Sequence, residues 1–427
     1  MTYNSYLMYK NPQLRFFVVL MAFLAVFLVG ADSADAKVAS GKGVTEGRYF
    51  VESKNMLVKS LFGVQHDFNG GFTSDLTTGE VWTLERIFKV KVTEVPLYQI
   101  NPADVSDTAA SAGSIVTDAV DFVSGLDQKI KDRGAVPDSQ IPWGVKKVYG
   151  DNLIFSASGG KDVSVAVLDT GANTKHYDLS ARIKDCKDFT RGPVPRSACE
   201  DKQGHGTHVA GIISADGGSD GKGIWGVASE ADILAYKVCR NDGTCWADDI
   251  AAAVYYASEN GANIITLGLG GDSDNFLLRD AIASAVKNNV LVVASAGNDG
   301  PEKGSIDFPA SYKDVVSVSA LSEDGTVPDW SSRGVNDGDY QKENKEIEFT
   351  APGENIESAW IDGGYRYLSG TSMSSPHVAG LAAKLWNGSA TSTEIQLKRI
   401  ARDVWTIGDD TSTGFGIPIL PRAVPSE

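Results

Sequence analysis

Residues 370–380 read Gly-Thr-Ser-Met-Ser-Ser-Pro-His-Val-Ala-Gly, and the interpretation of the whole chain starts from this stretch. Apolar residues recur at helical spacing from Val378 to Leu385, which predicts a buried helix that begins near Ser372. Free backbone N–H groups and the positive end of the helix dipole gather at such a start. A serine placed there could attack a carbonyl while nearby donors hold the oxyanion, but serine is also an ordinary N-cap.

Strand and helix patterns alternate through the chain before this stretch. The strand patterns are nearly continuous apolar runs, as expected for strands buried on both faces, at 163–168, 233–238, 264–269, 290–295 and 315–318. Helical patterns lie between them at 208–214, 248–260 and 276–288. The alternation predicts an α/β fold, with a mostly parallel sheet and helices on both of its faces.

Two polar motifs lie at the ends of these elements. Asp169 opens Asp-Thr-Gly directly after the first core strand, where ligands bind in open α/β sheets, although an Asx-turn is the simpler interpretation of an isolated Asp. Aspartic proteases need two such carboxylates, and Asp-Thr-Gly occurs once here. His205 lies between glycines that let the backbone turn sharply. His208 begins a helical run and is predicted to be a buried, hydrogen-bonded residue. A two-histidine metal site is the weaker alternative, because His-x-x-His lacks the Glu and the helical spacing of His-Glu-x-x-His.

In chain order these residues are Asp169, His205 and Ser372, which is the order found in subtilisin. The three motifs resemble the signature blocks of the subtilisin family of serine proteases, and the resemblance covers roughly residues 140–420. It implies that Ser372 is the nucleophile and His205 the general base, with Asp169 orienting the imidazole. It also implies that Asn298 donates to the oxyanion, together with the backbone N–H of Ser372.

The resemblance extends to the substrate-binding edges. The family pairs the substrate backbone with an edge strand that Gly268, Leu269 and Gly270 resemble, and Gly243 would lie on the other side of the substrate. The usual family residue at the position of Gly268 is Ser. We expect catalysis to be unaffected by this departure, while the details of the pocket differ.

Asp307 precedes Phe308-Pro309, where the family has a cis peptide bond, and matches the position at the base of the primary specificity pocket. A carboxylate there would favour Lys or Arg in the substrate residue before the scissile bond. The alternative is an ordinary loop residue that points to solvent. Lys129, Lys131 and Arg133 lie just before the expected catalytic domain, where an enzyme specific for basic residues could release itself.

The chain order predicts four parts. Residues 1–36 have the pattern of a secretory signal peptide, with an apolar run shorter than the roughly 20 residues of a membrane span; an uncleaved membrane anchor is the alternative. Residues 37–100 form a small α+β unit, with strands expected at 48–51, 57–58 and 87–92. By position this unit matches the family's propeptide, a folding chaperone and inhibitor. A linker with a processing site and a short helix at 114–132 is expected at 101–140, and the peptidase domain at 141–427.

Four cysteines follow the predicted signal: Cys186, Cys199, Cys239 and Cys245. An even number in an exported chain suggests two disulfides, for which three pairings are possible. Proximity in the sequence favours Cys186–Cys199 and Cys239–Cys245. The spacings and the lack of an adjoining histidine cluster argue against zinc.

The family resemblance also implies a metal. Asp178 matches a carboxylate ligand of a structural Ca²⁺, and the segment 214–226, which contains Asp216 and Asp220, would supply backbone carbonyls. The alternative is a flexible acidic surface loop. The chemistry of the family requires no cofactor for catalysis.

Together these patterns predict a secreted serine endopeptidase, made as an autoprocessed zymogen, that cleaves proteins or peptides through an acyl-enzyme. The resemblance implies a monomer whose propeptide acts as an inhibitor, and the net charge of −16 argues against nucleic acid as a partner. Three alternatives are a membrane-anchored protease, an inactive subtilisin-like binding protein, and a sedolisin-like acid peptidase. The second would lack a triad member, and the third would lack His205 and carry an acid in place of Asn298.

Overall fold

The computed structural model describes residues 46–100 and 136–421, which divide into two compact units between Glu94 and Val95. The predicted signal peptide, the expected helix at 114–132 and the basic residues of the linker lie outside the described residues. Segment 95–100, which the sequence assigned to the first unit, belongs with the second. Among the described residues, no helix has the length and apolar character needed to cross a membrane.

The first unit is a four-stranded antiparallel sheet with two helices, in agreement with the α+β expectation. Its elements are β1 (Glu46–Val51), α3 (Met56–Phe62), β2 (His66–Phe68), β3 (Gly71–Thr77), α4 (Thr78–Arg86) and β4 (Val92–Glu94), with strand order β2-β3-β1-β4. The strand expected at 57–58 is wrong, because Asn55 caps a helix there by accepting from the N–H of Leu57. The strand expected at 87–92 is also wrong except for Val92, which begins β4. Short apolar runs do not distinguish helix from strand.

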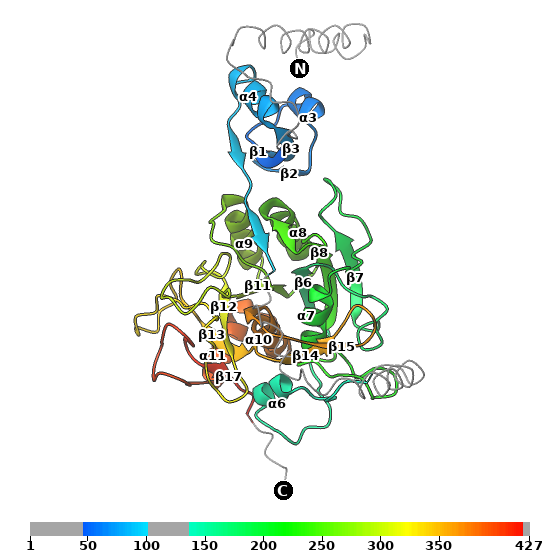
Figure 1. Cartoon of the computed structure of the whole chain (residues 1–427), viewed down its shortest axis with the longest axis vertical. Coiled ribbons are helices and arrows are strands. Elements are labelled where there is room, and N and C mark those ends of the chain that lie inside the picture. The colour runs from blue at the N-terminus through cyan, green and yellow to red at the C-terminus, as the bar shows by residue number, and fades with distance from the viewer. Residues whose placement is uncertain (1–45, 101–135, 422–427) are drawn as a thin grey trace, which may run out of the picture. The chain divides into compact units, whose positions relative to one another are not determined.

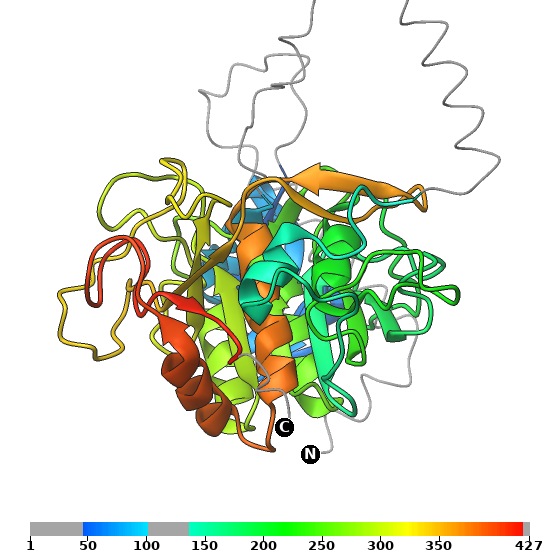
Figure 2. The same ribbon diagram turned by 90° about the horizontal axis from the view of Figure 1, so that it is seen from below.

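The second unit is built on a seven-stranded parallel sheet of order β13-β12-β11-β10-β6-β8-β7, which confirms the predicted α/β class (Figures 1 and 2). The strands are β6 (Ser164–Asp169), β7 (Ile183–Asp188), β8 (Asp232–Lys237), β10 (Ile264–Leu267), β11 (Leu291–Ser295), β12 (Val316–Leu321) and β13 (Phe349–Pro352). The pattern of apolar runs missed β7 because this edge strand is partly exposed and carries Lys and Asp residues.

Helices cover both faces of this sheet. They are α6 (Trp143–Tyr149), α7 (His205–Ser214), α8 (Ala247–Glu259), α9 (Phe276–Lys287), α10 (Thr371–Leu385) and α11 (Ala390–Ile400). Helices α7 and α10 pack on each other, as do α8 and α9. Gly261, with a φ of 87°, follows the end of α8 as expected for a C-terminal glycine. Helix α7 begins at His205 rather than at His208.

Helix α10 forms the centre of the unit, since every residue from Thr371 to Ala383 is buried. Its side chains Val378 and Leu381 belong to one hydrophobic core with residues of the sheet. Full burial of such a side chain contributes about 1.5–3 kcal/mol. Ser372 is therefore held by a helix that has little freedom to move.

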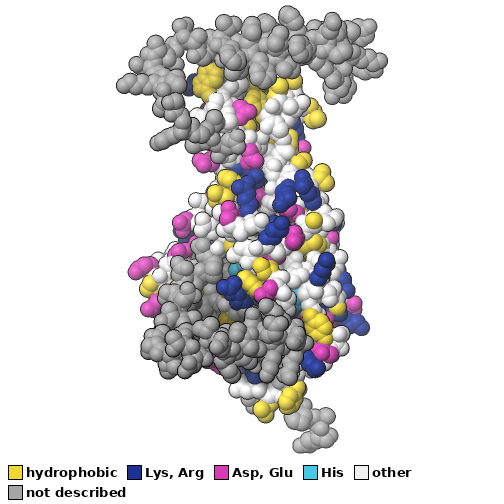
Figure 3. Space-filling model, turned by 45° about the vertical axis from the view of Figure 1, so that its right-hand side comes forward, with side chains coloured by type: hydrophobic (Ala, Val, Ile, Leu, Met, Phe, Trp, Pro, Cys, Tyr) yellow, Lys and Arg dark blue, Asp and Glu magenta, His cyan; other side chains and the backbone are white. Residues whose placement is uncertain are grey.

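Short antiparallel strand pairs complete the second unit. They are β5 (Leu97–Gln99) with β9 (Thr244–Trp246), β14 (Ile356–Ala359) with β15 (Tyr365–Leu368), and β16 (Ala401–Arg402) with β17 (Ile417–Pro418). Charged side chains of both signs are interspersed on the face of the molecule seen in Figure 3.

The cysteines form the two disulfides that proximity favoured. Cys186 is bonded to Cys199 and Cys239 to Cys245, with Cα–Cα distances of 5.1 and 4.1 Å. The second bond closes a turn that leads from the end of β8 into β9. A disulfide bond that closes a loop stabilises a protein mainly by restricting the conformations of its unfolded state.

Candidate active site

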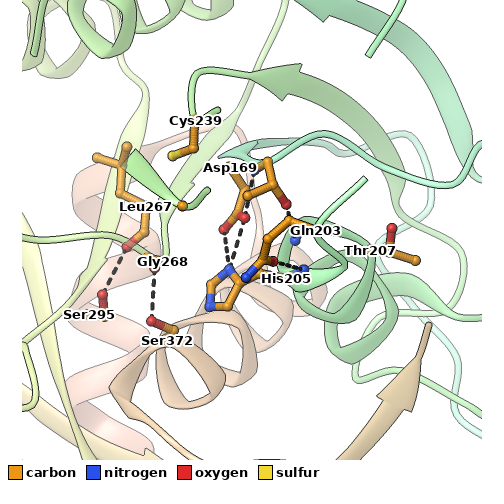
Figure 4. A network of polar contacts seen from close by, with 12 residues as sticks. Asp169, Gln203, His205, Thr207, Cys239, Leu267, Gly268, Ser295 and Ser372 are labelled. Carbon is orange, nitrogen blue, oxygen red and sulfur yellow. Dashed lines mark hydrogen bonds and ion pairs between the residues drawn. The ribbon is translucent and has the colours of Figure 1, made fainter. Parts of the chain in front are cut away.

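Three elements bring the predicted catalytic residues to one place. Asp169 is the last residue of β6, His205 is the first residue of α7, and Ser372 is the second residue of α10. The side chains of all three are buried or nearly so. Figure 4 shows them around Gly268, which follows the carboxyl end of β10.

Asp169 fixes the orientation of the His205 ring. The Nδ1 atom of His205 lies 2.9 Å from Oδ1 and 2.8 Å from Oδ2 of Asp169, and Oδ1 also accepts from the backbone N–H of Thr170 at 2.7 Å. Nδ1 must carry the proton to donate to this carboxylate. Nε2 is then the basic nitrogen, and it has no hydrogen-bond partner among the described residues.

Gly268 is the point on which the three side chains converge. The hydroxyl of Ser372 donates to the carbonyl of Gly268 at 2.8 Å. A Cβ atom added at Gly268 would lie 3.1 Å from Oδ2 of Asp169, 3.2 Å from Cε1 of His205 and 3.6 Å from Cβ of Ser372. The space that glycine leaves at this position therefore borders the triad.

Two polar residues that the sequence interpretation missed hold the start of α7 and the end of β6. Asp201 accepts from the backbone N–H groups of Gly204 and Thr207 through its two oxygens, at 2.8 and 3.0 Å. Lys237 pairs with Asp169 in the parallel register, and its buried ammonium donates to the carbonyl of Thr170 at 2.7 Å. Asp201 lies four residues before α7, outside the position where a capping residue is sought in a sequence, so no local signal marked it.

Asn298 lies next to the start of α10. Its Oδ1 accepts from the backbone N–H of Thr371 at 3.0 Å, which satisfies one of the donors at the helix N-terminus. Because the oxygen end of the amide is bound to Thr371, the donor Nδ2 is on the opposite side of the same group. The structure thus brings Asn298 beside Ser372, as the sequence predicted.

The two predicted substrate edges hold a segment of the chain itself. The backbone of Gln99 exchanges two hydrogen bonds with Gly270, at 2.9 and 3.0 Å, and the N–H of Ile100 donates to the carbonyl of Gly243 at 3.1 Å. Strand β5 also pairs with β9 in antiparallel register. Leu269 is buried, with its side chain in the interior. This placement of residues 95–100 was not foreseen, although Tyr98 and Ile100 have the alternating pattern of a half-buried strand.

Asp307 is buried, with 5% of its side chain exposed, so the alternative of a solvent-facing loop residue is wrong. It lies against Gly270 and Gly297, where an added Cβ would come within 2.5 and 2.6 Å of its Oδ2. Burial, and then the charges of Asp299 and Asp272, raise the pKa of Asp307 to about 8. The Phe308–Pro309 peptide bond is cis, as expected.

Asp178 has the properties of a metal ligand. It is fully buried, and its Oδ2 accepts from the N–H of Ile224 at 3.0 Å and from the hydroxyl of Tyr365 at 2.8 Å. Its Oδ1 is buried without a hydrogen-bond partner among the described residues, and burial raises the pKa of this carboxyl. Asp216 pairs with Arg182, while Asp220 is exposed and bound to Tyr177. An orphaned buried carboxylate oxygen fits a hard cation such as Ca²⁺.

Comparisons with known proteins agree with this geometry. Residues 160–416 match the subtilase family. The chain is 38% identical over 413 residues to a protein named subtilisin from Bacillus sp. strain TA39, which covers 90% of this chain and 93% of the relative. It is 40% identical over 250 residues to the major intracellular serine protease of Bacillus subtilis strain 168, covering 57% and 75% of the two chains. The solved structure of sphericase superimposes with a TM-score of 0.65 and 42% identity, covering 67% of this chain and all of sphericase.

Proposed function

Because this chain belongs to the subtilase family of serine proteases, we propose that it is a secreted endopeptidase with Asp169, His205 and Ser372 as its catalytic triad. The observation that carries the proposal is the hydrogen bond that orients the His205 ring. Its Nδ1–H is bound to Asp169, and its Nε2 has no partner among the described residues, in a site shared with Ser372. This is the arrangement that a general base for a serine hydroxyl requires.

In the proposed mechanism the Ser372 hydroxyl leaves the Gly268 carbonyl and transfers its proton to Nε2 of His205. The Ser372 oxygen forms a bond to the substrate carbonyl carbon, and the π electrons of the carbonyl move to its oxygen. Asn298, through Nδ2, and the backbone N–H of Ser372 would hold that oxyanion. The carboxylate of Asp169 stabilises the imidazolium that results.

The tetrahedral intermediate then breaks. The C–N bond cleaves as Nε2 of His205 gives its proton to the leaving amine, which leaves an ester on Ser372. Water then attacks the ester carbon while Nε2 of His205 takes one of its protons. The C–O bond to Ser372 breaks as Nε2 returns that proton to the Ser372 oxygen, which releases the carboxylic acid product. The substrate and one water are the reactants besides the chain.

Covalent labelling tests the assignment of Ser372. The purified, secreted enzyme is treated with a fluorophosphonate, which reacts with activated serine hydroxyls, and the modified peptide is located by mass spectrometry. We expect label on Ser372 that disappears in His205→Ala. The matched control is Ser374→Ala, two residues along the same helix, which should still be labelled. Label on another residue, or equal labelling of His205→Ala, would contradict the triad.

We propose the domain assignment that the sequence predicted: signal peptide 1–36, propeptide 37–100, linker 101–140 and peptidase 141–427. The pairing of segment 95–100 with both Gly243 and Gly270 supports an inhibitory propeptide, because that segment uses the backbone groups that a substrate would use. We also propose autoprocessing within the linker and a monomeric mature enzyme. N-terminal sequencing of the secreted protein tests the boundaries, since an N-terminus before residue 101 would contradict them.

We propose that Asp307 gives a preference for Lys or Arg before the scissile bond. Its burial between Gly270 and Gly297 supports a place inside a pocket, and a basic side chain would stabilise the ionised carboxylate there. Because its pKa is about 8 without such a partner, the preference should strengthen as the pH rises through that value. Peptides ending in Arg or Leu, compared for the wild type and Asp307→Asn, test this. An unchanged Arg preference in the variant would remove Asp307 from the pocket.

We propose that Asp178 is a ligand of a structural Ca²⁺, with carbonyls of 214–226 completing the site. The ion would neutralise the buried carboxylate that has one oxygen without a partner. Its role would be stability, because a ligand bound only by the folded state raises the midpoint of unfolding. Thermal unfolding of chelator-treated enzyme with and without millimolar Ca²⁺ tests this, with Asp178→Asn as the variant that should lose the response. An unchanged midpoint in the wild type would contradict the site.

A further inference from the structure

A buried cation lies beside Asp169 and takes no part in the proposed mechanism. We propose that Lys237 is a positioning residue for the triad, whose ammonium fixes the chain at Asp169 and extends the activity of the enzyme to lower pH. The inference rests on the proposed function, because it takes Asp169, His205 and Ser372 as the triad. It gives a role to a residue outside that triad.

The register of the sheet places Lys237 next to Asp169. Each is the last residue of its strand, and the two are partners in the parallel pairing of β8 with β6. The backbone N–H groups of Val238 and Cys239 both donate to the Asp169 carbonyl, at 2.9 and 3.1 Å. Both side chains are buried, with 3% of Lys237 and none of Asp169 exposed. An ammonium in this position acts on the carboxylate with little screening by water.

Thr170 connects the ammonium to both members of the Asp169–His205 pair. The Lys237 ammonium donates to the carbonyl of Thr170 at 2.7 Å. The N–H of Thr170 donates to Oδ1 of Asp169 at 2.7 Å, and its hydroxyl accepts from the N–H of Gly206 at 2.9 Å. Gly206 lies in the first turn of α7, directly after His205. Fixing Thr170 therefore fixes the carboxylate and the histidine relative to each other.

Charged groups from several parts of the second unit face Lys237. Burial lowers the pKa of Lys237, and three carboxylates oppose this effect, those of Asp201, Asp188 and Asp169. Asp188 is the last residue of β7 and Asp201 precedes α7, and both side chains are buried. Arg191, which is exposed, pairs with Asp188 at 3.4 Å and adds to the lowering. Among these groups Lys237 is the buried cation, so its loss would leave the carboxylates with an exposed cation only.

The effect on His205 follows from the signs of these charges. An ammonium disfavours an imidazolium nearby, while carboxylates favour it. Asp169 faces Nδ1 of the His205 ring. The charge of His208 also acts on His205, but burial lowers the pKa of His208 to about 3, so it stays neutral above pH 5. Without Lys237, His205 would take up a proton at a higher pH and could then no longer accept one from Ser372.

The test measures kcat/KM of the secreted, processed enzyme from pH 5 to pH 9, on a peptide without charged side chains so that Asp307 has no charged partner in the substrate. Lys237→Met removes the charge and keeps the apolar stem, and Lys237→Arg keeps the charge. The acid midpoint is the pH at which kcat/KM falls to half of its plateau. It should rise by at least about 0.5 unit in the Met variant and stay within about 0.2 unit of the wild type in the Arg variant.

A second neutral variant covers the case in which Lys237→Met does not fold. Lys237→Gln keeps a hydrogen-bond donor without the charge, so its acid midpoint should rise as in the Met variant. At the plateau, kcat of the Met variant should fall about three- to tenfold with little change in KM, because the Thr170 carbonyl loses its donor.

The matched control is a second lysine whose ammonium donates to a backbone carbonyl. Lys384 lies in α10 and donates to the carbonyl of Ser158 and, at 3.0 Å, to the hydroxyl of Tyr149. Burial lowers the pKa of Lys384 as well. Lys384→Met should lower the midpoint of thermal unfolding and leave the acid midpoint unchanged. Equal acid shifts in Lys384→Met and Lys237→Met would overturn the proposal, because the loss of activity in acid would then report stability.

The outcomes separate the two levels of the inference. An acid midpoint that moves in neither neutral variant, or that moves as far in Lys237→Arg, would overturn the role of Lys237 and leave the proposed peptidase standing. An enzyme that neither takes the fluorophosphonate on Ser372 nor cleaves any peptide would overturn both.

Discussion

The helices that carry His205 and Ser372 begin differently from α9 and α11 of the same unit. Helices α9 and α11 have side-chain caps, from Asn275 and Ser389, that accept hydrogen bonds from their own first turns. Helices α7 and α10 begin after Gly204 and Gly370, with φ of 111° and 151° and no side-chain cap.

Residues outside these helices perform the capping in α7 and α10. Thr170, which follows β6, accepts from the N–H of Gly206, and Asp201, four residues before α7, accepts from the N–H of Thr207. Asn298 accepts from the N–H of Thr371. Both helices are also buried through most of their length, whereas α9 and α11 are buried on one side. The starts of α7 and α10 are thus held by residues outside the helices, while His205 and Ser372 face the region around Gly268.

The largest expected effect is the loss of catalysis when His205 at the start of α7, or Ser372 at the start of α10, is replaced. Ser372→Ala and His205→Ala should each lower kcat by about six orders of magnitude, the size known from subtilisin, because triad members act as a unit. The double variant should be no worse than either single variant. Steady-state peptide hydrolysis measures this, with Ser389→Ala in the capped helix α11 as a control that keeps its activity. Additive losses in the double variant would contradict a shared triad.

A smaller loss is expected at the residue that caps α10 from a distance. Asn298→Ala should lower kcat by about 100- to 1,000-fold with little change in KM, a magnitude established in subtilisin for this kind of donor. Asn298→Asp keeps the oxygen that binds Thr371 and loses the amide donor, so it should be as impaired. Recovery of activity in the Asp variant would mean that Asn298 acts only as a cap.

Acid should destabilise the fold through two buried histidines, His208 in α7 and His377 in α10. Burial lowers the pKa of His208 to about 3 and of His377 to about 4, while both return to about 6.5 on unfolding. Their neutral forms stabilise the fold fully above pH 6.5, and this stability is lost as the pH falls below 6.5 because the unfolded chain binds the protons. The loss is about 2 kcal/mol for each by pH 5.

The pH dependence of unfolding free energy in denaturant checks this. Between pH 6 and pH 5, the number of protons that the chain takes up on unfolding should be lower by about one in His377→Gln than in the wild type. The same slope in both proteins would mean that His377 is charged in the folded state.

The last comparison measures the two kinds of helix start in one stability experiment. Gly204→Ala should destabilise the fold by at least about 2 kcal/mol, because its φ is left-handed and a Cβ would lie 2.3 Å from the ring of Trp360. Asn275→Ala removes an ordinary cap of α9 and should cost about 1 kcal/mol. Thermal unfolding of the two variants ranks them. A glycine variant no less stable than the Asn275 variant would remove the distinction between the two helix starts.

From the sequence by itself one could predict the fold class, five of the seven strands of the parallel sheet, the disulfide pairings that proximity favoured and the residues that meet around Gly268. Periodicity and turn residues report local structure, and the strands of the sheet centre are apolar enough to be recognised one by one. The prediction failed for short or polar elements. Residues 57–58, which lie in the helix α3, were predicted as a strand, and the edge strand β7 was missed.

Only the tertiary structure decided the contacts between residues distant in sequence. Lys237 donates to the carbonyl of Thr170 beside Asp169, Asp307 is buried between Gly270 and Gly297, and segment 95–100 pairs with Gly243 and Gly270. Each is an ordinary polar residue or short strand in its local sequence. The hydrogen bonds and desolvation that give them a role exist only after the chain has folded, because they join groups from different elements.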